Sequence, residues 1–148
     1  MTVEKRPYGL SWQINLPYPL AVARTREALR EEGLGPVSVI DVGGLVRQEL
    51  DVDTRPYVIL GAGSAPLMRR LLEAEPGLGL LLPCNVVVYE LDGASVVAAV
   101  DAMAVIGLAG NPRLSSLAAE LKARLERVAE RVAATAGEGE DFVLPVPR

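Results

Sequence analysis

The sequence contains no histidine and a single cysteine among its 148 residues. Without histidine, the chain cannot form a Ser-His-Asp triad, a Cys-His nucleophile pair or the usual histidine-containing zinc sites. One cysteine also excludes an intrachain disulfide, a four-cysteine metal cluster and a CxxC redox pair. These absences remove the commonest forms of nucleophilic, zinc-dependent and dithiol chemistry.

Basic and aromatic residues are also scarce. The chain has 15 lysines and arginines against 19 acidic residues, a net charge of −4, and only 4% aromatic residues. Nucleic-acid binding rests on clustered basic residues, often joined by aromatic rings on which bases stack. We therefore expect no nucleic-acid partner.

Long hydrophobic runs are missing as well. Pro83 and Asn85 interrupt one of the two most apolar regions, and Asp101 interrupts the other. Neither region supplies the roughly 20 uninterrupted apolar residues of a membrane span, and the N-terminal MTVEKRPYG does not resemble a secretory signal. We expect a soluble, cytoplasmic protein with no membrane partner.

The length suits one domain. We expect a single domain over residues 1–136, because no long linker or internal repeat interrupts it. Residues 137–148, GEGEDFVLPVPR, are acidic and then apolar with two prolines. This composition predicts a C-terminal tail that is mobile or docks on a partner.

Hydrophobic periodicity and turn residues predict the order strand, helix, strand, strand, helix, strand, strand, helix. Asp92-Gly93 between two valine-rich runs is typical of a β-hairpin. Asn111-Pro112 begins a long amphipathic helix, and residues 45–50 are expected to form a helical turn. This order predicts an α+β fold, a mostly antiparallel sheet with helices packed on one face.

The turn from Gly61 to Ser64 connects a predicted strand to a predicted helix. Exposed N–H groups at a helix start favour anions, so this turn is a candidate site for a small anionic ligand. The dinucleotide motif fails because Pro66 replaces its third glycine, and the Walker motif is absent. Capping of the helix by Ser64 is the favoured alternative.

Cys84 and Asn85 begin a hydrophobic strand after Pro83. A reactive thiol would need activation by arginine or a helix end, because no histidine is present. A buried, unreactive cysteine is the favoured interpretation. Tyr57 could place its hydroxyl at a pocket rim, although core packing is favoured for it.

Several aspartates lie near predicted strand ends, and two that converge could bind a divalent cation. Turn and solvation roles are the default for such residues, so we predict no metal site and no cofactor. These aspartates are Asp41, Asp51, Asp53, Asp92 and Asp101.

The chain resembles the "domain of unknown function 302" family of small bacterial and archaeal proteins. The segments that carry the resemblance are YGLSWQINLPYPLAVARTREALREEGLG, IDVGGLVRQELDVDTRPYVILGA, LEAEPGLGLLLPCNVVVYELDG and VVAAVDAMAVIGLAGNP. The resemblance implies an α+β fold and homodimer formation, and no established activity. Family members typically carry Cys-Asn-Pro where this chain has Gly63-Ser64-Ala65, and often Asp-Pro where it has Asp101-Ala102, so any two-cysteine chemistry is in doubt here.

These observations favour a non-enzymatic homodimer that binds a small ligand or a partner in a pocket between the 61–65 turn and the 83–85 segment. The alternatives are a thiol-dependent enzyme or carrier using Cys84, and a structural or interaction scaffold. The candidate ligand-binding residues are Gly61, Ala62, Gly63, Ser64, Pro83, Cys84 and Asn85.

Overall fold

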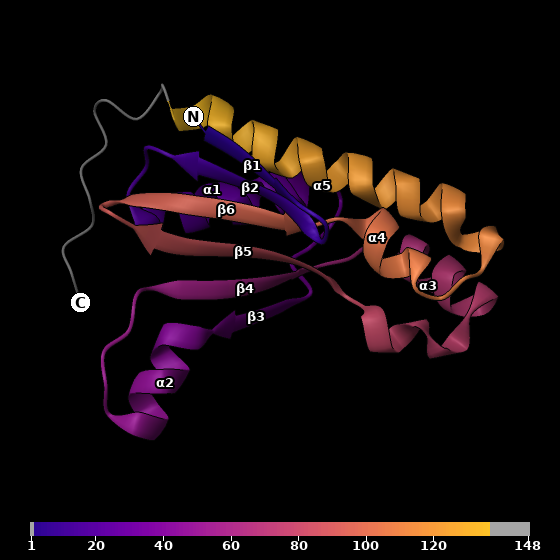
Figure 1. Ribbon diagram of the computed structural model, residues 1–148, viewed down its shortest axis with the longest axis horizontal. Coiled ribbons are helices and arrows are strands. Elements are labelled where there is room, and N and C mark those ends of the chain that lie inside the picture. The colour runs from indigo at the N-terminus through magenta and orange to yellow at the C-terminus, as the bar shows by residue number, and fades with distance from the viewer. Residues whose placement is uncertain (1, 137–148) are drawn as a thin grey trace.

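The computed structural model describes residues 2–136 of the chain. Its centre is a six-stranded antiparallel sheet in the order β1-β2-β6-β5-β4-β3 (Figure 1). The strands are β1 (Thr2–Arg6), β2 (Gly9–Ile14), β3 (Ser38–Asp41), β4 (Tyr57–Ala62), β5 (Cys84–Leu91) and β6 (Ala94–Val100).

The β5–β6 hairpin holds the centre of the sheet. Leu91 pairs with Ala94, which leaves Asp92 and Gly93 as a two-residue loop. Both loop residues have positive φ, 51° and 78°, as a type I′ turn requires. The predicted hairpin is confirmed, and its turn sets the register of the two central strands.

The helices and short 3₁₀ segments follow the strands along the chain. They are α1 (Tyr18–Glu31), α2 (Val42–Leu50), α3 (Ala65–Ala74), η1 (Pro76–Leu81), α4 (Ala102–Gly107), η2 (Pro112–Leu114) and α5 (Ser115–Thr135). Asn111 caps η2 by accepting a hydrogen bond from the backbone N–H of Arg113, and α5 continues directly from it. None of these helices is both long and apolar enough to cross a membrane.

Helices α1 and α5 pack on each other and on one face of the sheet. The core between them contains Trp12 of β2, Leu29 of α1, Val88 of β5 and Leu125 of α5, all buried. Side chains alternate across a strand, so the neighbours of Trp12 and Val88 face the other way. We call that opposite surface the open face.

A buried carboxylate joins the two packed helices. Glu32, directly after α1, forms ion pairs with Arg127 and Arg131 of α5 at 2.7 and 2.9 Å. Burial alone would raise the pKa of Glu32, but the hydrogen bonds and charges of the two arginines outweigh burial and lower the pKa. These two ion pairs therefore contribute to the packing of α1 against α5 only while Glu32 is ionised.

The α+β class and the antiparallel sheet are confirmed, but the predicted element order is incomplete. It lacks β1, which lies at the sheet edge and whose Glu4, Lys5 and Arg6 are exposed, so no apolar alternation marks it. It also lacks α4, which Asp101 caps. The helical turn expected at residues 45–50 is part of a longer helix, α2, because Asp41 caps it at Gly44.

Candidate binding groove

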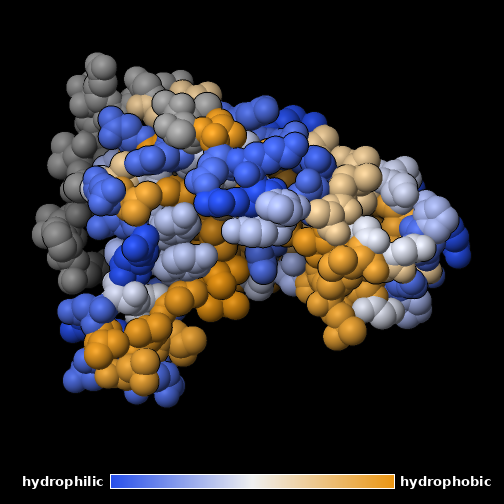
Figure 2. Space-filling view, viewed as in Figure 1, coloured by the Kyte–Doolittle hydropathy of each residue, from blue (hydrophilic) through white to orange (hydrophobic). Residues whose placement is uncertain are grey.

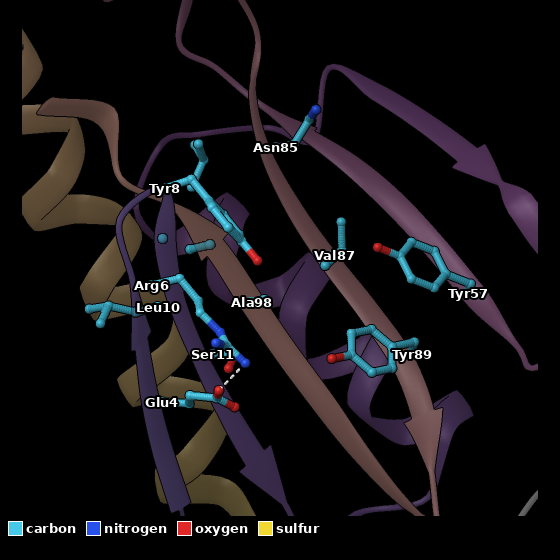
Figure 3. Close-up of a pocket in the computed structure, with 13 residues that line it drawn as sticks. Glu4, Arg6, Tyr8, Leu10, Ser11, Tyr57, Asn85, Val87, Tyr89 and Ala98 are labelled. Atoms are coloured by element: carbon cyan, nitrogen blue, oxygen red, sulfur yellow. Dashed lines mark ion pairs between the residues drawn. The ribbon is translucent and has the colours of Figure 1, made fainter. Parts of the chain in front are cut away.

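A groove of about 360 Å³ crosses the open face of the sheet (Figure 3). Five elements line it, namely β1, β2, β4, β5 and β6 with the β1–β2 turn. The lining residues are Glu4, Arg6, Tyr8, Gly9, Leu10, Ser11, Tyr57, Asn85, Val87, Tyr89, Ala98, Ala99 and Val100. Its volume lies within the range of small-molecule sites, roughly 300–1,000 Å³.

The floor of the groove is built from small side chains on three adjacent strands. Ser11 of β2 pairs with Ala98 of β6, and Ala98 pairs in turn with Val87 of β5. Gly9 also belongs to the floor and adds no side chain to it. A Cβ at this position would lie 2.5 Å from the carbonyl oxygen of Ala99, so a larger residue does not fit without a shift. The floor is therefore low and mostly apolar, and larger residues stand on both sides of it.

Tyr57 and Tyr89 form one wall. They are direct cross-strand partners, and their rings are stacked with centroids 5.3 Å apart and planes 3° apart. The guanidinium of Arg55 lies 5.8 Å from the centre of the Tyr89 ring, a cation–π geometry. Burial, and to a lesser degree the neighbouring Tyr89, raises the pKa of Tyr57, so its phenol is protonated at neutral pH.

The opposite wall comes from β1 and the turn that follows it. Tyr8 occupies the β1–β2 turn and is 68% exposed. Arg6 forms an ion pair with Glu4 two residues earlier, on the same side of the strand. The hydroxyls of Tyr8, Tyr57 and Tyr89 all point into the groove (Figure 3).

Most polar groups in the lining are uncharged. Tyrosine and serine hydroxyls and the Asn85 amide offer hydrogen-bond donors and acceptors, and the Arg6–Glu4 pair leaves no net charge at that wall. The lining contains no cysteine, lysine or aspartate. Within residues 2–136, no three His, Cys, Asp or Glu side chains come close enough together to hold a metal ion.

Of the seven candidate residues, only Asn85 lines the groove. Gly61 pairs directly with Asn85, and Ala62 pairs with Cys84, within the β4–β5 ladder. Gly61 also packs so tightly that a Cβ there would overlap the Oγ of Ser38 and lie 2.7 Å from the Cγ of Pro83. Hydrogen-bonded strands and the Pro83 ring thus fill the space at Gly61 and Ala62, and this packing gives no support to the pocket expected between the 61–65 turn and the 83–85 segment.

Ser64 takes the capping role that was the favoured alternative. Its Oγ accepts a hydrogen bond from the backbone N–H of Leu67 at 3.3 Å, and Gly63 is buried beside it. The start of α3 borders a wide, shallow hollow with Arg70, Glu120 and Arg124. Arg124 is already paired with Glu120 at 2.9 Å, which leaves less positive charge for an anion there.

Cys84 faces the core and is only 2% exposed. Burial raises the pKa of its thiol to about 11. Because the thiolate is the reactive form, the position of this residue argues against the thiol alternative.

The aspartates serve turns, caps and surface ion pairs. Asp41 caps α2 and Asp101 caps α4, and Asp51 ends α2 with a positive φ of 52°. Asp92 lies in the hairpin turn, and Asp53 pairs with Arg47. Each aspartate thus has a local structural role that accounts for its position.

Sequence reasoning missed Tyr8, Tyr89, Arg6 and the floor residues, although it noted Tyr57 as a rim candidate. The usable signal was the two-residue period of the strands, which puts Val87 and Tyr89 on the face opposite to Val86 and Val88. A run of three valines hides that signal, because every position in it is apolar.

The chain is similar to a crystal structure of an uncharacterized conserved protein of DUF302 from Bacillus stearothermophilus. The two share 25% sequence identity with a TM-score of 0.77, over 84% of this chain and 98% of that one. No curated protein matches the chain. The model of the family described as "Domain of unknown function DUF302" matches residues 10–132, which is most of the chain, and the protein therefore belongs to the DUF302 family.

Proposed function

We propose that this protein binds a small organic ligand in the groove of the open face and carries out no chemistry on it. The groove itself is the observation that carries the proposal: an apolar floor, tyrosines on both walls and converging hydroxyls in about 360 Å³. A pocket that combines an apolar lining with a few convergent polar groups is the usual form of a small-molecule site.

The non-enzymatic part of the proposal is supported by the groups that line the groove. The carboxylate of Glu4 is engaged by Arg6, and the raised pKa of Tyr57 keeps that phenol protonated. A protonated phenol donates a hydrogen bond but does not act as a base at neutral pH. Ser11 lies directly opposite Glu4 on the neighbouring strand, but the ion pair with Arg6 engages that carboxylate, which makes it a poor base for the serine hydroxyl.

Two alanines on the same face of β6 provide a matched test. Ala98 lies in the floor of the groove, whereas Ala94 lies outside it near the β5–β6 turn. The probe is a fragment mixture with aliphatic, aromatic and carbohydrate members, added to isotopically labelled protein and followed by amide chemical shifts.

We expect at least one fragment to shift amides of Ser11, Val87 and Ala98. The substitution Ala98→Leu fills the floor and abolishes those shifts, whereas Ala94→Leu retains them. Absence of any shift around the floor with every fragment would refute the proposal, and so would shifts that Ala98→Leu leaves unchanged.

A second candidate function is association with a partner, which we propose to be a second copy of this chain. We define the arm as β3 and α2 with the residues up to 53. All four residues of β3 are exposed, and α2 has no buried residue. Apolar surface gathers on the arm, where Leu45 and Leu50 are 51% and 66% exposed (Figures 1 and 2).

The arm is attached to the rest of the structure chiefly through β3, which pairs with β4, while α2 buries no residue of its own. Isolated helices shorter than about 12–15 residues are marginal in water, and α2 has nine. Burial of one leucine side chain contributes roughly 1.5–3 kcal/mol, so mutual burial of two arms would stabilise both. This supports a homodimer, as family resemblance implies.

Sedimentation velocity tests the dimer. We expect the unmodified chain to sediment as a dimer and Leu50→Glu to sediment as a folded monomer. Leu80→Glu is the matched control, because Leu80 is still more exposed but lies in η1, outside the arm. A monomeric unmodified chain, or a dimer that Leu50→Glu leaves intact, would contradict the arm interface.

The remaining expectations have weaker support. Because burial raises the pKa of Cys84 to about 11, its thiol is protonated at neutral pH, and the thiol alternative has no support. The scaffold alternative relied partly on the tail at 137–148, which lies outside the described residues. We also propose a cytoplasmic location, with which the single unpaired cysteine agrees.

A further inference from the structure

The shape of the groove restricts what can lie in it. Its floor spans β2, β6 and β5, and neighbouring strands are about 4.8 Å apart, so the floor is about 10 Å across. Ser11, Ala98 and Gly9 raise the floor very little. Val87 is the largest side chain of this floor. A low, mostly apolar floor of this width makes broader contact with the face of a planar molecule than with a puckered one.

The walls add aromatic surfaces to this low floor. Tyr57 and Tyr89 stand on one side, and Tyr8 stands on the other (Figure 3). Tyr8 is 68% exposed, so much of its ring surface is available for contact. Aromatic rings favour offset-stacked and edge-to-face contacts with other rings, which a flat aromatic ligand between these walls would supply.

Most of the polar groups lie around the rim, and Ser11 is the polar residue of the floor. Three phenol hydroxyls point into the groove (Figure 3), and the Asn85 amide also lines it. A hydroxyl both donates and accepts a hydrogen bond, and so does an amide. The tyrosine hydroxyls and the Asn85 amide can therefore form hydrogen bonds with hydroxyl and carbonyl groups at the edge of a ligand.

The charges argue against a highly charged ligand. Arg6 is paired with Glu4, and the guanidinium of Arg55 lies over the ring of Tyr89. A phosphate or polycarboxylate would need basic groups that are not already paired. The groove thus matches a ligand that is neutral or carries little charge.

We propose that the ligand is a planar aromatic or heteroaromatic molecule with hydroxyl or carbonyl groups at its edge. This inference rests on the proposed binding function and names its ligand class. The low floor contacts the ring faces, the tyrosine walls contact the ring system, and the rim hydroxyls with Asn85 form hydrogen bonds with the edge substituents.

Three probes separate the two parts of this recognition. Quercetin is planar and hydroxylated, naphthalene is planar without polar groups, and myo-inositol is hydroxylated without a planar ring. Affinities are measured by calorimetry, and the site is located by amide chemical shifts. We expect quercetin to bind at the floor amides, naphthalene to bind at least about tenfold more weakly, and myo-inositol not to bind.

Conservative variants then test the rim. Tyr57→Phe and Tyr89→Phe each keep the stacked ring and remove one hydroxyl. Each is expected to weaken quercetin about two- to tenfold, the effect of one hydrogen bond, and to leave naphthalene unchanged. Ala98→Leu is expected to abolish quercetin binding, while Ala94→Leu retains it. Circular dichroism and thermal unfolding establish that each variant is folded.

Several outcomes would overturn the ligand class. Naphthalene that binds as tightly as quercetin refutes a role for the rim, and quercetin binding that Ala98→Leu leaves intact refutes the site. If quercetin fails while myo-inositol or an aliphatic fragment shifts the floor amides, the class is wrong and the proposed binding function stands. If neither these probes nor any member of the fragment mixture binds there, both are wrong.

Discussion

The single cysteine allows a direct test of whether the folded chain contains a reactive thiol. Burial raises the pKa of Cys84 from an ordinary 9.0 to about 11. At neutral pH this change lowers the thiolate fraction about a hundredfold, because each pKa unit changes that fraction tenfold. Alkylation by iodoacetamide should therefore be at least about a hundredfold slower in the folded chain than in an unfolded one.

The low exposure of the side chain slows the reaction further. With only 2% of Cys84 exposed, the reagent reaches the sulfur only when the sheet opens locally. The opened sheet exposes a thiol of ordinary pKa, so along this route the rate is lowered by the small fraction of molecules that are open, whereas direct attack on the closed form is lowered by ionisation; both routes predict strong protection. Above the ordinary pKa the unfolded chain loses its thiol proton while the folded chain keeps it, so folding stability declines as pH rises from about 9 toward 11.

Mass spectrometry of the alkylated chain over time provides the assay. The same reaction in concentrated guanidinium chloride gives the rate of the unfolded chain. The folded rate should rise with pH up to about 11, the pKa of the thiol. Equal rates for the folded and unfolded chains at neutral pH would refute the placement of Cys84 and restore the thiol alternative.

Two further substitutions test the packing that positions the groove. Glu32→Gln removes a carboxylate that is 7% exposed and paired with two arginines; because those arginines are half exposed, we expect a loss of about 1–2 kcal/mol at neutral pH. Because the pKa of Glu32 is lowered in the folded chain, this contribution is present above pH 4.5 and is lost as the pH falls through the folded pKa. The free energies of unfolding of the unmodified chain and the variant, measured in urea, should therefore converge in acid. A difference that stays constant with pH would contradict the ionic account. Gly61→Ala should cost about 1–3 kcal/mol because its Cβ would meet the Ser38 hydroxyl and the ring of Pro83. Gly77→Ala, with open space around it, should change the urea midpoint little, and equal effects of the two substitutions would contradict the close packing at Gly61.

Local signals predicted the parts of the fold that depend on local chemistry. The β5–β6 hairpin follows from Asp92-Gly93, whose residues tolerate positive φ. Helix α5 follows from a regular apolar stripe, and its members Leu121, Leu125 and Val128 are all buried. In both cases, neighbours within about four residues determine the structure, so the sequence alone was sufficient.

The arm shows where local signals were insufficient. Gly43 and Gly44 suggest a flexible break, since glycine is a poor helix former. The helix nevertheless begins there, because the Asp41 carboxylate accepts a hydrogen bond from the N–H of Gly44 at 2.9 Å. One cap thus compensates in part for two unfavourable residues. Nothing in the apolar pattern predicts this, because α2 buries no residue.

The groove was missed because it depends on register between strands that are distant in sequence. Ser11 and Ala98 form part of one floor only because β2 lies beside β6, 87 positions along the chain. The predicted site used a different rule, that glycines at a strand-to-helix turn expose backbone N–H groups to a ligand. That rule needs solvent at the turn, and Gly61, Ala62 and Gly63 are buried. Asn85 belongs to both sites, because alternation along β5 turns it to the open face while Cys84 beside it faces the core. A one-residue slip of β5 would exchange the two side chains. The strand register therefore decides that this chain presents an amide to the groove and keeps its only thiol in the core.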